Sequence, residues 1–156
     1  MVFPACLVFL VSIVIYKGID TKYKEIECQI KLKCIYSSLI AYYEEHKQLP
    51  AYNEWYDLLM KEGDLSADVF RCPCLTKNTA GSYVINEKHD IFWVTSPSNT
   101  VLVFEGDLGW NQFGDMEQIT ERHRGGSYIL FSNGDIKFVH KDDYPSLQWG
   151  EDRNEK

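Results

Sequence analysis

The feature that most constrains this fold is a long stretch of helical periodicity. No proline interrupts the chain between Pro4 and Pro50. Apolar residues recur there at spacings of three and four in two series: Ile19, Tyr23, Ile26 and Ile30, then Cys28, Leu32, Ile35, Leu39, Tyr42 and His46. This spacing predicts one long helix that ends near His46, and two adjoining series predict a wide buried face.

The beginning of this stretch has the composition of a membrane anchor. Residues 2–16, VFPACLVFLVSIVIY, carry no charge and are followed by Lys17. We therefore expect residues 1–17 to form a hydrophobic membrane-anchor segment, although no basic leader or cleavage site marks a signal peptide. At about 1.5 Å per residue the run covers roughly 22 Å of a ~30 Å hydrocarbon core, so a buried N-terminal helix is the alternative.

The rest of the 156-residue chain has the length of one small domain, which we place at residues 18–141. Asn53 is placed to cap a short helix whose inward side chains are Trp55, Leu58 and Leu59. From residue 64 onward, short apolar runs alternate with turn residues and predict strands at Ser82–Asn86, Ile91–Thr95, Thr100–Glu105, Ser127–Ser132 and Asp135–His140.

These elements predict an α+β fold, in which the long N-terminal helix packs against a small antiparallel sheet. Residues 142–156 are rich in charge, and we expect them to form a flexible tail. The net charge of −7 argues against a nucleic-acid partner, because nothing basic is clustered to bind phosphates.

The last two strands are predicted to form a hairpin. Asn133-Gly134 lies between two alternating runs, and this dipeptide favours a two-residue type I′ turn. Such a turn would pair Phe131 with Ile136 and Ile129 with Phe138. These four side chains would then share the face that covers the long helix.

His123, beside Arg124, is the histidine with the clearest chance of a chemical role. It could be a general base or a metal ligand, but no nucleophile or orienting acid is identifiable near it in the sequence. We therefore expect no catalytic residue and no enzymatic activity, and a metal-dependent enzyme centred on His123 is the weaker alternative. In the structural interpretation, Gly125-Gly126 allows a tight turn at the start of the hairpin, and the imidazole forms a hydrogen bond with a nearby loop.

Four cysteines raise the question of a structural metal. Cys72-Pro-Cys74, together with Cys28 and Cys34, would form a four-sulfur set. Zinc ribbons place two residues between the cysteines of each pair, whereas these pairs enclose one and five, so the spacing fits poorly. A disulfide is the alternative in an oxidising compartment.

An acidic loop is a candidate calcium site. Its candidate ligands are Asp107 and Asp115, with Glu105 and Glu117 beside them, around the segment GDLGWNQFGD. Oxygen ligands at irregular spacing suit calcium in a flexible loop. We favour the other interpretation, a solvated acidic loop with exposed Trp110 and Phe113, and therefore expect no bound metal; calcium is the alternative.

Several motifs in order resemble one family. His123, nine further residues and Asn133-Gly134 resemble the His-x9-Asp-Gly signature of prepilin-type, processing-associated domain proteins, which are type IV pilin-like or pseudopilin-like. That family's helix segment is similar to CQIKLKCIYSSLIAYYEEHKQLP. Its Cys-Pro step is similar to FRCP, and its Ser-Tyr is similar to GSY. Its Pro-Ser-x-Thr-Val strand is similar to SPSNTVLVFEGD. The resemblance covers roughly residues 19 to 140.

The resemblance implies a pilin-like fold and a structural role without turnover. It implies a membrane-anchored subunit or accessory of a type IV pilus or type II secretion-like filament, with other pilin-like subunits or secretion machinery as partners. The soluble domain would lie on the extracytoplasmic side of the cytoplasmic membrane. The signature residues would be structural: His123, Gly125, Gly126, Asn133 and Gly134. The resemblance also favours a disulfide between Cys28 and Cys72. We expect no cofactor, and the resemblance makes calcium the alternative.

The chain departs from the family pattern at two places. Asn133 replaces the signature Asp, a mild change because both residues accept left-handed turn geometry. The N-terminus shows no basic leader, no Gly-Phe processing step and no glutamate in the apolar helix, where Ala5 is found. Two expectations follow: either the true start lies upstream, or this member is no longer processed. A cell-surface binding module on a pilin-like scaffold, with loops around Trp93 and Trp110 as its ligand face, is the competing function.

Overall fold

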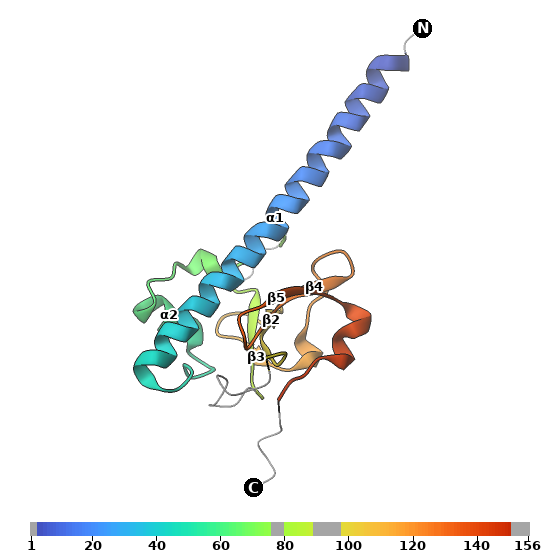
Figure 1. Cartoon of the computed structure of the whole chain (residues 1–156). Coiled ribbons are helices and arrows are strands. Elements are labelled where there is room, and N and C mark those ends of the chain that lie inside the picture. The colour runs from blue at the N-terminus through green and yellow to red at the C-terminus, as the bar shows by residue number, and fades with distance from the viewer. Residues whose placement is uncertain (1–2, 76–79, 89–97, 151–156) are drawn as a thin grey trace.

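The protein folds into a long helix and a five-stranded, mostly antiparallel sheet, so the predicted α+β class is confirmed. The computed structural model describes residues 3–75, 80–88 and 98–150, with side chains from residue 18 onward. In Figure 1 the C-terminal half of the helix lies along the domain, and its N-terminal half extends away from it. The predicted strand Ile91–Thr95 lies outside the described residues.

Helix α1, Phe3–His46, ends where the sequence predicts, and its second apolar series faces the core except for the exposed His46. Cys28, Leu32, Ile35 and Leu39 are all fully buried. The first series, by contrast, is exposed, with Ile26 at 54%. The prediction of one wide buried face was wrong because Ile26 and Cys28 are two positions apart, which at about 100° per residue is roughly 200° around the helix.

The predicted membrane anchor, residues 1–17, lies outside the part of the chain whose side chains are described. In the described part, no helix is both long enough and apolar enough to cross a membrane.

The sheet has the strand order β3-β1-β2-β4-β5. Its strands are β1 Tyr83–Asn86, β2 Val101–Glu105, β3 Phe113–Gly114, β4 Gly126–Phe131 and β5 Ile136–His140. Strands β1 and β3 pair in parallel, and the other neighbours pair antiparallel. The sequence predicted four of these strands to within a residue or so, but β3 consists of only two residues and left no periodic signal.

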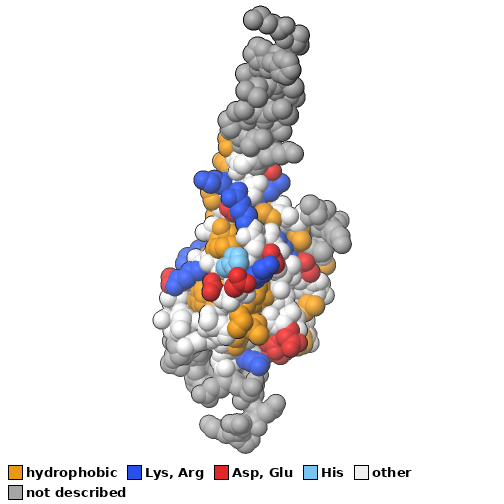
Figure 2. All heavy atoms as spheres, turned by 90° about the vertical axis from the view of Figure 1, so that its right-hand side faces the viewer, with side chains coloured by type: hydrophobic (Ala, Val, Ile, Leu, Met, Phe, Trp, Pro, Cys, Tyr) orange, Lys and Arg blue, Asp and Glu red, His pale blue; other side chains and the backbone are white. Residues whose placement is uncertain are grey.

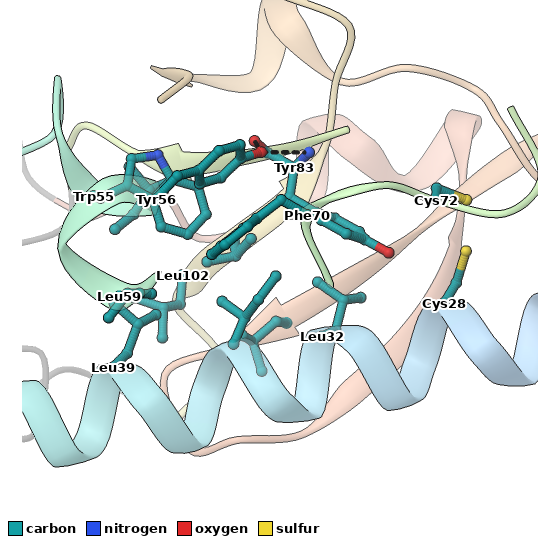
Figure 3. Close-up of a cluster of buried hydrophobic side chains, with 14 residues drawn as sticks. Cys28, Leu32, Leu39, Trp55, Tyr56, Leu59, Phe70, Cys72, Tyr83 and Leu102 are labelled. Atoms are coloured by element: carbon teal, nitrogen blue, oxygen red, sulfur yellow. Dashed lines mark hydrogen bonds between the residues drawn. The ribbon is translucent and has the colours of Figure 1, made fainter. Parts of the chain in front are cut away.

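Apolar side chains cover both faces of the sheet. On one face, α1, the short helix α2 (Trp55–Glu62) and the 3-10 turn η1 (Ala67–Phe70) enclose the larger core. Figure 3 shows Leu39 of α1 and Leu59 of α2 meeting Leu102 of β2. Each fully buried leucine contributes roughly 1.5–3 kcal/mol by removing apolar surface from water.

Helix α2 forms as predicted, but its N-terminal cap comes from a different residue. The N-cap is Glu54, whose side chain makes no capping bond, rather than Asn53. Instead, the Asn111 side-chain oxygen accepts a hydrogen bond from the Tyr56 backbone N–H at 2.7 Å. A distant loop therefore satisfies one of the N–H groups that a helix start leaves without a partner.

The hairpin of β4 and β5 forms, but its register is shifted by one residue from the prediction. Leu130 pairs with Ile136 and Tyr128 with Phe138. The Gly134 N–H bonds the Phe131 carbonyl, and Gly134 itself has φ +83°, so the loop has three residues with a left-handed glycine instead of two.

This shift reverses the predicted faces of β4. Leu130 and Tyr128 pack toward the helix, whereas Ile129 and Phe131 belong to the smaller core on the other side. A one-residue slip moves every side chain of a strand to the opposite face. The prediction held for Ile136, which packs against the larger core.

The C-terminal segment also differs from the predicted flexible tail. Residues Lys141–Ser146 form a 3-10 helix, and Gln148 pairs with Thr100 beside β2. The Trp149 ring lies edge-on against Phe104, with 5.2 Å between the ring centroids. The C-terminal segment is packed because the Trp149 side chain covers the outer face of the sheet. Residues 151–156 lie outside the described part.

We predict that Gly134→Ala lowers the free energy of unfolding by about 1–3 kcal/mol, measured by urea denaturation of the full chain. An added Cβ at Gly134 would lie 2.5 Å from the Tyr36 ring, and the positive φ penalises any L side chain. Gly18→Ala is the matched control, since nothing lies within 4 Å of its Cβ position on α1. It should leave stability unchanged or raise it by up to ~1 kcal/mol. Equal effects of the two substitutions would contradict the assigned turn.

Candidate metal centre

Three cysteines and one histidine from distant parts of the chain meet beside α1. Cys28 comes from the helix, Cys72 and Cys74 from the loop after η1, and His123 from the loop before β4. One ligand atom from each of the four lies within 4.8 Å of all the others. Figure 3 shows the sulfur atoms of Cys28 and Cys72 turned toward each other.

A tight turn presents the two loop thiols. The Leu75 N–H donates to the Cys72 carbonyl at 3.1 Å, and Pro73 occupies the second position of this turn, where its fixed φ is favoured. The Cys72 N–H donates to the Ser82 hydroxyl at 3.0 Å, which ties the turn to the start of β1. The Cys-Pro-Cys step thus directs both thiols to the same side.

A second turn positions His123. The backbone groups of His123 and Gly126 bond each other at 2.9 and 2.7 Å, and the two residues between them, Arg124 and Gly125, both have positive φ. This is the type I′ pattern. Gly126 approaches β5 so closely that an added Cβ would lie 2.2 Å from the Val139 carbonyl. The expected structural role of this glycine pair is therefore supported by its geometry.

Glu105, at the end of β2, is a fully buried carboxylate that holds this region together. Its oxygens accept hydrogen bonds from the Ser127 hydroxyl at 3.1 Å and the Tyr128 N–H at 2.9 Å, and His123 Nε2 lies 2.9 Å away. Arg122 lies 3.8 Å from the same carboxylate and also pairs with Asp107. The buried negative charge is therefore compensated by several partners.

The pKa shifts follow from these contacts. Burial favours a neutral ring, but hydrogen bonds with Cys72 and Glu105 outweigh it and raise the pKa of His123 to about 9. The hydrogen bond with Cys28, followed by burial, raises the pKa of the Cys72 thiol. Burial chiefly raises the pKa of Cys74 to about 12. Both loop cysteines are therefore neutral thiols near neutral pH.

Cys72, His123 and Glu105 superficially resemble a nucleophile, a base and an orienting acid, which the sequence did not bring together. Two observations argue against that use. His123 Nε2 faces both Cys72, at 3.8 Å, and Glu105, whereas a catalytic triad uses opposite ring nitrogens. The Cys72 thiol has a raised pKa and is 3% exposed, while reactive cysteines have lowered pKa values and are accessible.

The structure brings together only part of the cysteine set that the sequence analysis considered for zinc. Three of the four cysteines proposed as a zinc set meet, but Cys34 does not belong to the cluster, and His123 takes the fourth place. Cys34 follows Cys28 by six residues, which on a helix is about 120° away from it. This helical offset is the signal that could have excluded Cys34. Cys28 and Cys72 are close as the resemblance implies, but all four described cysteines are free thiols.

The two candidate calcium ligands, Asp107 and Asp115, have other partners in the structure. Asp107 pairs with Arg122, and Asp115 caps a 3-10 turn by accepting a hydrogen bond from the Glu117 N–H at 3.0 Å. Neither belongs to the two groups of ligand atoms that come together among the described residues. The second of these groups consists of Glu45, His46 and Glu62 and is exposed at the surface.

Comparisons of the chain with family models, with curated proteins and with solved structures find no match.

We predict that Glu105→Ala lowers the free energy of unfolding by about 3–5 kcal/mol, because His123, the Ser127 hydroxyl and the Tyr128 N–H all lose their buried partner. Asp107→Ala removes the other carboxylate that pairs with Arg122, but Asp107 is 41% exposed, and its loss should cost about 0–1 kcal/mol. Thermal and urea denaturation of both variants would measure the difference. If the two substitutions lowered the free energy of unfolding by similar amounts, Glu105 would not be the carboxylate that holds this region together.

Proposed function

We propose that the protein is a pilin-like, membrane-anchored subunit or accessory of a type IV pilus or type II secretion-like filament. The proposal combines the family resemblance of the sequence with the shape of the molecule, in which a long helix extends beyond a small α+β domain (Figure 1). The membrane contact is assigned to residues 1–17, which keep their predicted role as an anchor. No catalytic turnover is assigned to the protein.

The observation that carries the proposal is an apolar stripe on the exposed side of α1. The stripe consists of Ile19, Tyr23, Ile26 and Ile30, which are 54% to 74% exposed. Their spacing of four, three and four residues places them on one face of the helix. Figure 2 shows apolar side chains at the surface of the helix just below its grey N-terminal part.

The stripe fits a helix of another pilin-like subunit as its partner. Contiguous apolar side chains at the surface mark an interaction site, and a straight row at helical spacing matches the ridge-and-groove packing of two helices. The stripe begins at Ile19, two residues after the predicted anchor, so a partner helix anchored in the same membrane could run beside it. Filament subunits that pack their helices together would cover this row.

The competing function, a binding module with Trp110 on its ligand face, has less support. The Trp110 ring packs against Tyr56 and Phe70, and its N–H donates to Asp57 at 2.8 Å. Trp110 thus secures its own loop to α2. Trp93, the other residue of that hypothesis, lies outside the described residues.

We predict that a photo-crosslinking amino acid at Ile26 captures the helix of a second pilin-like subunit in intact cells. The same amino acid at Ala41 is the matched control, since Ala41 is exposed on the same face of α1 but lies about 16 Å along the helix beyond Ile30, the last residue of the stripe. Adducts identified by mass spectrometry should form at Ile26 and be rare at Ala41. Equal capture at the two positions, or no adduct at Ile26, would contradict the proposal.

A substitution tests the same surface. Ile26→Asp should reduce the amount of protein in a sheared filament fraction at least several-fold, because a charge on the stripe would be buried without a partner. Ala41→Asp adds the same charge outside the stripe and should assemble normally. Circular dichroism should show both variants folded, since neither residue belongs to the core.

A further inference from the structure

We propose that Cys28, Cys72, Cys74 and His123 bind one zinc ion, as a structural site that fastens the long helix to the domain. The inference is independent of the proposed function, because it concerns only the cluster of four side chains. Three cysteines and a histidine are one of the established donor sets of structural zinc, and the soft sulfur ligands favour zinc over magnesium or calcium.

The distances fit a tetrahedral ion. With Zn–S bonds of about 2.3 Å and a Zn–N bond of about 2.0 Å, ideal geometry separates two sulfurs by about 3.8 Å and a sulfur from the nitrogen by about 3.6 Å. Cys72 Sγ and His123 Nε2 lie 3.8 Å apart, and all four ligand atoms lie within 4.8 Å of one another. Shifts of about 1 Å or less would complete the coordination.

The surroundings also suit a metal. Cys28, Cys72 and His123 are 0%, 3% and 3% exposed, which would keep water from the ion, and half-buried Cys74 leaves a path for its entry. When His123 Nε2 binds the ion, Glu105 keeps its hydrogen bonds from Ser127 and Tyr128. The carboxylate is therefore not left without partners.

A buried hydroxyl without a regular hydrogen bond points at the cluster. The Tyr83 hydroxyl makes no hydrogen bond of ordinary geometry among the described residues, and the polar group that it interacts with is the Cys28 thiol. Figure 3 shows it directed toward the sulfur atoms of Cys28 and Cys72. A metal-bound thiolate is a stronger acceptor than a neutral thiol, so zinc binding would strengthen this interaction. This buried donor is an observation separate from the ligand set itself.

A metal accounts for the whole cluster better than a disulfide does. A bond between Cys28 and Cys72 would leave the Cys74 thiol and the His123 ring at the same place without a shared role. One tetrahedral ion uses all four groups. It would link α1 to the Cys-Pro-Cys turn and to the loop before β4, three segments that are far apart in the chain.

The test is metal binding by the full chain, purified with reductant and stripped of metal with a chelator. We expect one zinc ion per chain by elemental analysis, and cobalt(II) as a substitute should give the absorption of tetrahedral thiolate coordination. Cys74→Ser should weaken zinc binding more than about 100-fold, because it removes a ligand. Cys34→Ser is the matched control: it alters a cysteine of the same helix outside the cluster and should change affinity less than about 3-fold.

Two substitutions at His123 test the zinc site by a second route if the Cys74 variant folds poorly. His123→Cys should retain zinc, since four cysteines are also a zinc donor set, whereas His123→Ala should lose it. Circular dichroism must show Cys74→Ser folded without metal for its result to count in favour. The proposal is overturned if the reduced wild-type chain binds no zinc, if Cys34→Ser weakens binding as much as Cys74→Ser, or if thiol counting finds Cys28 and Cys72 joined in a disulfide that survives added zinc and mild reductant.

Discussion

The seam between α1 and the sheet is the contact on which the rest of the structure depends. Cys28, Leu32, Ile35 and Leu39 form its helical side, and each is fully buried. Among the described side chains, Cys28 is the first buried residue along the helix, so the seam begins where the helix leaves the domain. The proposed metal centre lies at that point.

Two kinds of interaction hold the domain together, and they do different things. Apolar burial in the seam supplies most of the stability but has no direction, so by itself it would tolerate sliding of the helix. The buried Glu105 carboxylate is directional, because its two oxygens bond groups at defined positions. These contacts hold Ser127, Tyr128 and His123 in place relative to the central strand. Burying a charge is unfavourable unless its partners are in place, which makes this arrangement specific.

Particular residues show which features of the structure could be predicted from the sequence and which could not. The end of α1 near His46 was predictable, because Leu49-Pro50 stops a helix and the periodicity extends up to it. The hairpin was predictable but not its register, because Asn-Gly fits both a two-residue turn and a three-residue turn with glycine in the left-handed position. In the fold, Gly134 lies against the Tyr36 ring of α1, which is a tertiary contact that local sequence does not show. The pilin-like assignment remains a proposal.

The sequence by itself determined the long helix, the α+β class and the hairpin of the last two strands. These follow from local spacing, since proline positions and apolar periods act within a few residues. Only the tertiary structure decided that His123 joins Cys28, Cys72 and Cys74 while Cys34 does not, and that Glu105 lies beneath them. Such a grouping depends on which strands pair and on which side of the helix faces the sheet. Those choices are made by long-range packing, for which one sequence carries no local signal.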